Sequence, residues 1–331
     1  MLRGAIIGFG EVARHGHWPA WANCPDARIV AVVDRSESRR QLATELDDRV
    51  AAFATFADLT SAMGTAAVDF VDICTPPSLH PEPMMAAIDR GWHVLCEKPF
   101  VLDASIIDFV IRAAARHEVA VVPVSNWKYA PIIQAATEAL VTGAIGKLQR
   151  VSIETSRIRA AATADAGANW RRNPELAGGG ILMDHGWHAL YLALHWFNER
   201  AGSVTAALHL PTAGGVEDEA ALTVGFASGT ADIRLTWNGR ARRNACRLEG
   251  SDGDIVVDDD RLTVRSSSRQ ETTVFPAALS AGSHHADWFA AMLPDVVACF
   301  RQPSRAHPLV AEAAECLGII DQAYRSSRSL A

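Results

Sequence analysis

The sequence lacks several features that would mark other classes of protein. Its 331 residues contain no uninterrupted apolar run of about 18 residues, the length that a membrane-spanning helix needs. Lys and Arg number 31 against 38 Asp and Glu, so no basic excess is present to bind nucleic acid. The six cysteines form no CxxC pair, which argues against a disulfide framework and a zinc knuckle. We therefore expect a small-molecule partner, reduced thiols and no bound metal.

The amino-terminal residues and the overall composition narrow the class further. Residues 1–8 lack the apolar stretch and cleavage site of a secretory signal, so a cytoplasmic protein without a membrane partner is expected. Hydrophobic residues make up 49% of the chain, which suffices for a full core and argues against disorder. At roughly 100 to 200 residues per domain, the length predicts two domains.

The first third of the chain has the pattern of a doubly wound α/β domain. Short β-rich runs alternate with stretches of helical period, which is typical of a parallel sheet covered by helices on both faces. The expected strands are 4–7, 29–33, 70–74, 93–96 and 119–124. The expected helices are 12–23, 38–46, 80–90 and 104–116, followed by another at 131–141.

After Gly146 the pattern changes to that of a mostly antiparallel sheet. Alternating segments separated by turn signals are expected at 148–158, 203–210, 220–226, 230–237, 246–249, 254–257 and 262–265. Helices are expected at 183–197, 285–301 and 308–326, and residues 160–168 resemble a mobile linker. We place the domain boundary between 126 and 127, giving a dinucleotide-binding domain of 1–126 and a second domain of 127–331.

A dinucleotide-binding motif follows the first strand. Residues 8–13 read GxGxxA, in which Gly8 permits a tight turn and Gly10 lets the backbone approach a pyrophosphate. Asp34 ends the second strand 24 positions after Gly10, where an acidic side chain can accept hydrogen bonds from the adenosine ribose. Asp34 favours NAD, because a carboxylate would repel a 2′-phosphate. The neighbouring Arg35 could bind that phosphate, so NADP stays open. The cofactor contacts predicted here are Gly8, Phe9, Gly10, Glu11, Val12, Asp34 and Arg35.

Three further motifs resemble the Gfo/Idh/MocA family of sugar and cyclitol oxidoreductases. They are CTPPSLH at 74–80, CEKP at 96–99 and GGGILMDHGWH at 178–188, supported by NWRRNP at 169–174 and the helix around 317–326. The similarity covers nearly the whole chain. This resemblance implies a Rossmann domain and a second α/β domain with a large open sheet. It also implies an active site in the cleft between the two domains. A homodimer or homotetramer formed through the open sheet is implied as well.

The resemblance assigns roles to particular residues. Lys98 is implied to be both catalytic and substrate-binding, and Trp170 and Arg171 resemble the residues on the substrate side. The further residues implied to meet the cofactor are Thr75, Pro76, Pro77, His80, Glu97, Lys98 and Asn126. For His80, a capping or packing role is an equal alternative.

The residues themselves support a proton-transfer site. Asp184 and His188 are four positions apart, so on a helix they share one face and can reach one hydroxyl. We expect His188 to take the hydroxyl proton, Lys98 to stabilise charge on that oxygen, and Asp184 to orient the substrate or the imidazole. All three are expected to touch the substrate. The predicted enzyme is an NAD(P)-dependent oxidoreductase acting on CH–OH groups of a sugar, sugar acid or cyclitol.

Two other functions stay open at this stage. One is a noncatalytic NAD(P)-binding sensor or regulator, and the other is a glycosidase of the same family that uses NAD transiently. Two basic runs, Arg157 to Arg172 and Arg240 to Arg243, either bind an anionic group of the substrate or lie on a solvated surface. Part of the excess of tryptophan is expected to face carbohydrate, at Trp127, Trp170, Trp187 and Trp237.

Overall fold

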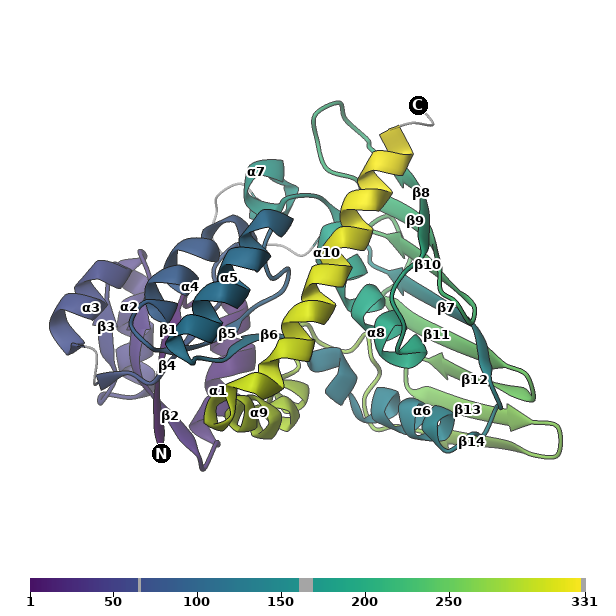
Figure 1. Cartoon of the computed structure of the whole chain (residues 1–331), viewed down its shortest axis with the longest axis horizontal. Coiled ribbons are helices and arrows are strands. Elements are labelled where there is room, and N and C mark those ends of the chain that lie inside the picture. Colours follow the sequence, from purple (N-terminus) through teal and green to yellow (C-terminus); the bar gives the residue numbers. More distant parts are fainter. Residues whose placement is uncertain (65–66, 161–168, 329–331) are drawn as a thin grey trace. The chain divides into compact units, whose positions relative to one another are not determined.

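The computed structural model describes residues 1–64, 67–160 and 169–328, drawn in Figure 1. The expected linker 160–168 thus lies outside the described residues, except for Ala160. The chain divides into two compact units. The first combines Met1–Asn126 with His284–Ala314, and the second combines Trp127–Ser283 with Glu315–Ala331.

The first unit is built on a six-stranded parallel sheet. Its strands are β1 (Leu2–Ile7), β2 (Ala27–Val33), β3 (Ala51–Phe53), β4 (Phe70–Ile73), β5 (His93–Cys96) and β6 (Val121–Pro123). Their order is β3-β2-β1-β4-β5-β6, and every pairing is parallel. Because the order reverses between β1 and β4, the carboxyl ends of these two strands border the crevice where such sheets bind ligands.

Helices connect the strands of this first unit. They are η1 (Ala13–His17), α1 (Trp18–Ala22), α2 (Glu37–Leu46), α3 (Phe56–Met63), η3 (Pro77–Leu79), α4 (Pro81–Ile88) and α5 (Ala104–His117). The expected helix at 12–23 contains a π-helical stretch, η1, in which Ala13, Gly16 and His17 are buried. Single π-turns inside helices are often found at functional positions.

The carboxyl-terminal part of the first unit differs from the predicted domain assignment. Residues His284–Ala314, with α9 (Ala286–Arg301) and η7 (Pro303–Ala306), were assigned to the second domain but cluster with the first unit. The reason is apolar packing, because the Phe289 ring lies 3.8 Å from the ring of His17 and 6.2 Å from that of Trp21. Phe300 likewise packs on Phe70 of β4, at 5.1 Å.

The second unit contains an eight-stranded, mostly antiparallel sheet. Its strands are β7 (Leu148–Ser156), β8 (Ser203–His209), β9 (Glu219–Gly225), β10 (Thr230–Thr236), β11 (Arg243–Gly250), β12 (Gly253–Asp258), β13 (Arg261–Ser266) and β14 (Gln270–Val274). The order is β14-β13-β12-β11-β7-β10-β9-β8, and among these pairs only β7 and β10 run parallel. The predicted α/β fold with these two sheet types is confirmed.

The sheet of the second unit has one covered and one exposed face. Along β9 the side chains alternate between exposed and buried, as expected for a strand with one face on a core. Figure 1 shows α6 (Pro131–Val141) and α8 (Trp187–Phe197) beside the same face of the sheet. The remaining elements are η4 (Asn126–Tyr129), η5 (Trp170–Arg172), α7 (Pro174–Ala177), η6 (Leu182–Gly186) and α10 (His307–Arg328).

Within 1–64, 67–160 and 169–328, no helix has both the length and the apolar character that crossing a membrane requires.

Candidate functional site

The glycine motif forms a tight turn between β1 and η1. Gly8 has φ +90°, a conformation that strains any residue with a Cβ, and a Cβ there would meet Thr75 Cγ2 at 2.9 Å. Among the described residues outside its chain neighbours, only Arg39 Nη1 would lie within 4 Å of a Cβ on Gly10, at 3.8 Å, so the backbone at Gly10 is open to a ligand. Phe9 is buried, while Glu11 and Val12 are half-buried at the start of the following helix.

Asp34 is fixed beside this turn at the end of β2. Its carboxylate accepts the Phe9 N–H at 2.7 Å and the Ser36 N–H at 2.8 Å. Arg39, which the sequence analysis did not single out, lies 3.4 Å from the same carboxylate and next to Gly10. Arg35 is exposed. The basic side chain beside the Asp34 carboxylate is therefore that of Arg39, one helical turn beyond Arg35.

The loop after β4 carries two buried hydroxyl groups that have no partner. Thr75 Oγ1 and Ser78 Oγ accept and donate no hydrogen bond within the described part of the chain. Pro76 is half-buried and Pro77 buried in the same loop. Such orphaned groups usually have a partner from water or a ligand. An open glycine turn, a fixed carboxylate and these hydroxyls fit a bound dinucleotide.

His80 holds this loop in place through backbone contacts. Its side chain is completely buried, with Nε2 at 2.7 Å from Thr75 O and Nδ1 at 3.3 Å from the Cys96 thiol. Nδ1 also lies 3.0 Å from the carbonyl oxygen of Phe100, so both ring nitrogens face backbone acceptors, and burial lowers the pKa of the imidazole. His80 thus holds the Thr75 backbone.

A buried charged cluster underlies the loop that carries Lys98. His17 in η1 places Nδ1 2.8 Å from Asp72 and Nε2 3.0 Å from Glu97, and Trp21 Nε1 donates to Asp72 at 2.7 Å. The second oxygen of Glu97 accepts the Lys98 N–H at 3.0 Å. A ring nitrogen held against each carboxylate requires a proton on both nitrogens, so His17 is an imidazolium.

The pKa shifts agree with a charged His17. Burial opposes the charge, but Asp72 and the other neighbouring groups outweigh it and hold the pKa of His17 well above 6.5. The pKa of Glu97 is lowered despite its burial, because His17 and Lys98 stabilise the carboxylate. Ligand-type atoms of His17, Asp72 and Cys74 lie within 4.8 Å of one another, but 2.8 Å between Nδ1 and a carboxylate oxygen is a hydrogen-bond distance. We therefore interpret the cluster as an ion network that fixes the backbone at Lys98.

In the second unit, the triple glycine lets other segments approach the helix that carries Asp184 and His188. A Cβ on Gly180 would overlap Glu217 O at 1.8 Å, and one on Gly179 would overlap Tyr324 Oη at 1.9 Å. The Glu217 side chain accepts the N–H groups of Gly180 and Leu182 and the Tyr324 hydroxyl, at 2.8 to 3.0 Å. Glu217 thereby caps η6, a role that no sequence motif indicates.

Asp184 lies in η6, in contact with two basic side chains. Arg171 Nε is 3.6 Å away and His185 Nε2 3.8 Å away. Arg171 stacks on Trp170, with its guanidinium carbon 4.4 Å from the ring centroid. The predicted substrate residues Trp170, Arg171 and Asp184 are therefore brought together.

His188, one turn further along, is held by two residues that the sequence analysis did not assign to it. Tyr191 Oη lies 2.8 Å from Nδ1 and also accepts the Trp127 N–H at 3.1 Å. The Trp127 indole stacks on the imidazole with ring centroids 4.6 Å apart. The orientation of His188 is thus fixed by Tyr191 and Trp127.

The prediction of four carbohydrate-facing tryptophans is wrong for Trp187 and Trp237. Each is only 1% exposed within the core of the second unit. Trp127 is also buried, against His188, whereas Trp170 is half-exposed. Trp187, at the start of α8, and Trp237, directly after β10, both point their large side chains inward.

The predicted residues therefore fall into two groups, one in each unit. The first unit holds the cofactor candidates together with Lys98, which is half-buried, and ends at the half-buried Asn126 in η4. The second unit holds Trp170, Arg171, Asp184 and His188.

Comparison with known proteins identifies the class of oxidoreductases that bind NAD through a Rossmann fold. Residues 2–124 match the family model described as the oxidoreductase family, NAD-binding Rossmann fold. Residues 133–256 match the GFO/IDH/MocA C-terminal domain. The chain belongs to the Gfo/Idh/MocA family, and its first unit contains the NAD-binding domain.

Several relatives carry the names of sugar dehydrogenases. The chain is 26% identical to D-apiose dehydrogenase of Paraburkholderia graminis, over 99% of this chain and 88% of that protein. It is 30% identical to oxidoreductase P35 of Formosa agariphila, over 59% of this chain and only 60% of that protein. A crystal structure of an Agrobacterium radiobacter oxidoreductase in complex with NAD+, L-tartaric acid and magnesium has the same fold. The two structures superpose with a TM-score of 0.83 and share 21% sequence identity. The match covers 100% of this chain and 97% of the other.

Proposed function

We propose that the protein is an NAD(P)-dependent dehydrogenase that oxidises a CH–OH group of a sugar, sugar acid or cyclitol, or reduces the corresponding carbonyl. The observation that carries this proposal is the fixed imidazole of His188, held by Tyr191 and Trp127 in the helix of Asp184. When bound, the nicotinamide ring exchanges a hydride with the substrate carbon.

The residues of the chain move the proton. Tyr191 Oη has two lone pairs and can accept both the Trp127 N–H and a proton on His188 Nδ1. That tautomer leaves His188 Nε2 free of a proton, so Nε2 takes the hydroxyl proton of the substrate. For Lys98 of the first unit we propose that its ammonium group stabilises negative charge that develops on the substrate. Asp184, paired with Arg171, orients the substrate.

An activity screen tests this proposal. The purified protein is incubated with NAD or NADP and a panel of aldoses, aldonates, uronates and inositols, and formation of the reduced cofactor is followed by absorbance. We expect turnover with at least one member. Release of an aglycone from glycosides without net reduction would identify a glycosidase, and binding of cofactor and ligand without either reaction would identify a sensor.

We propose NAD as the preferred cofactor, because the Asp34 carboxylate lies at the end of β2 and accepts the Phe9 N–H. Asp34→Asn removes the charge that accepts ribose hydroxyls, and hydrogen bonds to charged groups contribute about 1.5 to 3 kcal/mol. We expect the KM for NAD to rise roughly 10- to 100-fold and the KM for NADP to rise less or to fall. Initial rates with both cofactors measure this. Asp48→Asn, at an exposed position of the same unit, serves as the control. An unchanged NAD to NADP ratio would contradict the role of Asp34.

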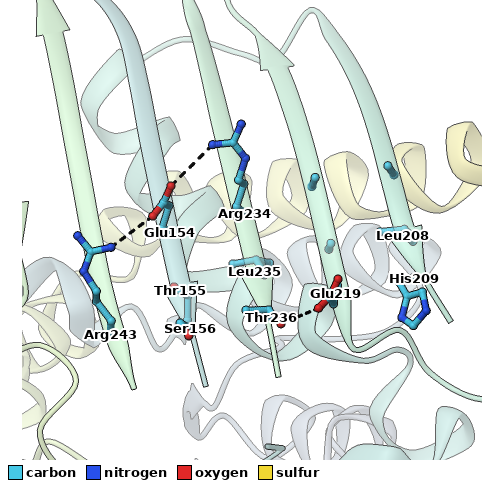
Figure 2. A pocket seen from close by; sticks show the side chains of 13 residues that line it. Glu154, Thr155, Ser156, Leu208, His209, Glu219, Arg234, Leu235, Thr236 and Arg243 are labelled. Carbon is cyan, nitrogen blue, oxygen red and sulfur yellow. Dashed lines mark hydrogen bonds and ion pairs between the residues drawn. The ribbon is translucent and has the colours of Figure 1, made fainter. Parts of the chain in front are cut away.

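We also propose that the protein forms a homodimer or homotetramer through the exposed face of the second sheet. Figure 2 shows this face, where Glu154 lies between Arg234 and Arg243 at 3.7 and 3.5 Å. A shallow pocket on it is lined by small and charged residues of β7 to β11, including Ala207, Ala221 and Glu219. A face with an ordered charge ladder and small side chains can pack on a second copy.

Charge reversal tests this interface. Glu154→Arg places three guanidinium groups in a row, which like-charge repulsion disfavours across a close interface. We expect a shift towards monomer by light scattering after size exclusion, whereas Glu45→Arg, at an exposed position of α2, has no such effect. A wild-type monomer, or an oligomer that Glu154→Arg leaves intact, would exclude this face.

The proposed compartment is the cytoplasm. All six cysteines are free thiols, and five of them are buried. Unpaired thiols are typical of a reducing compartment.

A further inference from the structure

Arg157 is a buried guanidinium with neutral partners. It follows the last residue of β7 and is only 6% exposed. Its Nη1 donates to Ser156 O, Arg243 O and Asn244 Oδ1, at 2.8, 3.4 and 3.1 Å. In the described part of the chain, no carboxylate forms an ion pair with it. A buried charge without a counter-charge is costly, so such groups normally pair with an anion.

The two carboxylates that most affect the charge of Arg157, Asp184 and Asp259, already have other partners. Burial lowers the pKa of Arg157 and Arg242 lowers it further, while Asp184 and Asp259 act in the opposite direction at longer range. Asn244, which accepts a hydrogen bond from Arg157, donates its N–H to Asp259. Asp259 accepts the N–H groups of Asn244 and Ser280 and the Ser280 hydroxyl. Asp184 is paired with Arg171.

Two further guanidinium groups add to the positive charge. Arg242 donates to Ser280 O, Gly282 O and Ser283 Oγ, all neutral acceptors. The buried Nε of Arg171 has no hydrogen-bond acceptor among the described residues. Among the described residues, these three guanidinium groups thus accompany two carboxylates, Asp184 and Asp259, which leaves an excess of one positive charge.

We propose that this excess charge binds an oxyanion of the substrate, a carboxylate or a phosphate, through Arg157 with Arg171 and Arg242 beside Asp184. The proposal rests on the proposed function and names its substrate class, an acidic sugar in place of a neutral polyol. Planar guanidinium groups match the geometry of both oxyanions, and their hydrogen bonds to an anion are stronger than those to a neutral hydroxyl.

Binding to the full-length protein in the presence of NADH tests the proposal, because NADH cannot accept a hydride and an alcohol is therefore not consumed. Isothermal titration compares D-gluconate, its neutral counterpart D-glucitol, and D-glucose 6-phosphate. We expect at least one anion to bind roughly tenfold or more tightly than D-glucitol, with affinity falling as salt rises. The tighter of the two anions identifies the oxyanion.

Variants assign the preference to this site. Arg157→Gln is expected to abolish the preference for the anion, and Arg157→Lys is expected to retain part of it. Arg242→Gln, at an exposed position, is expected to reduce the preference without disturbing the core. Arg269→Gln, at an exposed position beside Glu271, is the matched control and leaves the preference unchanged. Equal binding of gluconate, glucose 6-phosphate and glucitol, or a preference that survives both Arg157→Gln and Arg242→Gln, would overturn the inference. Turnover of neutral polyols in that case would leave the proposed function intact, whereas anion preference without any turnover would overturn the function alone.

Discussion

Lys98→Met and His188→Ala are each expected to lower turnover by roughly 100- to 10 000-fold, in His188→Ala with little change in cofactor binding. General acid–base catalysis and charge stabilisation at the reacting oxygen each contribute effects of this size. His188→Ala removes the group that takes the proton, and Lys98→Met removes the positive charge while keeping an unbranched side chain of similar length. Steady-state rates with the substrate found in the screen measure both variants.

Matched controls separate catalysis from general damage. Lys147→Met and His307→Ala replace exposed residues of the same types and are expected to keep wild-type rates. Near wild-type turnover in both Lys98→Met and His188→Ala would show that the assigned catalytic set is wrong.

Tyr191→Phe examines how His188 is positioned within the same experiment. The change keeps the ring that contacts the imidazole edge but removes the oxygen 2.8 Å from Nδ1. We expect a smaller loss of kcat than for His188→Ala, together with a displaced pH profile of kcat/KM. A purely structural role for Tyr191 would lower stability and leave the pH profile unmoved.

His17→Gln is expected to destabilise the first unit by about 3 to 5 kcal/mol, the cost of leaving buried charges without their partner. Asp72 and Glu97 would lose the imidazolium between them, although Trp21 would still donate to Asp72. Because Glu97 holds the Lys98 N–H, the variant is also expected to lower kcat. Urea unfolding gives the stability, and His15→Gln, at an exposed position two residues earlier, should stay within about 0.5 kcal/mol of wild type.

The same histidine predicts a pH dependence of stability. Its pKa in the folded protein is well above the ordinary value of 6.5, because Asp72 and neighbouring groups outweigh the effect of burial. Below the unfolded pKa both states are protonated and the stabilisation is complete. As pH rises from there through the folded pKa, the folded state binds more protons than the unfolded state, and stability is lost. Wild type should therefore lose more stability than His17→Gln as the pH rises above 6.5, the ordinary pKa of histidine. Parallel curves for the two proteins would contradict a charged His17.

Much of the fold could be predicted because its signals are local in sequence. The strands β1, β2, β4 and β5 are short apolar runs, and the glycine motif sits between β1 and the next helix. The omissions have physical reasons. β3 has three residues, none of them β-branched, and the five residues of β14 are all exposed, so neither shows hydrophobic periodicity. His284–Ala314 joins the first unit through contacts of Phe289 and Phe300 with residues far away in the sequence.

The candidate site shows the same division between local and distant signals. Asp184 and His188 could be predicted from their spacing behind three glycines. Glu217, which accepts hydrogen bonds from Gly180 and Leu182, lies 37 residues from Gly180, and His17 lies 55 residues from Asp72. Arg157 was visible only as a member of a basic run. Its burial, which separates it from ordinary surface arginines, depends on the packing of β7 and β11 and is not encoded in local spacing.

Transfer of deuterium from substrate to cofactor tests the proposed function most directly. A substrate found in the screen is labelled with deuterium at the reacting carbinol carbon, incubated with NAD and the wild-type protein, and the recovered cofactor is analysed by NMR. The proposed function predicts one deuterium at C4 of the nicotinamide for each ketone or lactone formed, and loss of this transfer in His188→Ala. Turnover that leaves the cofactor free of deuterium would contradict it.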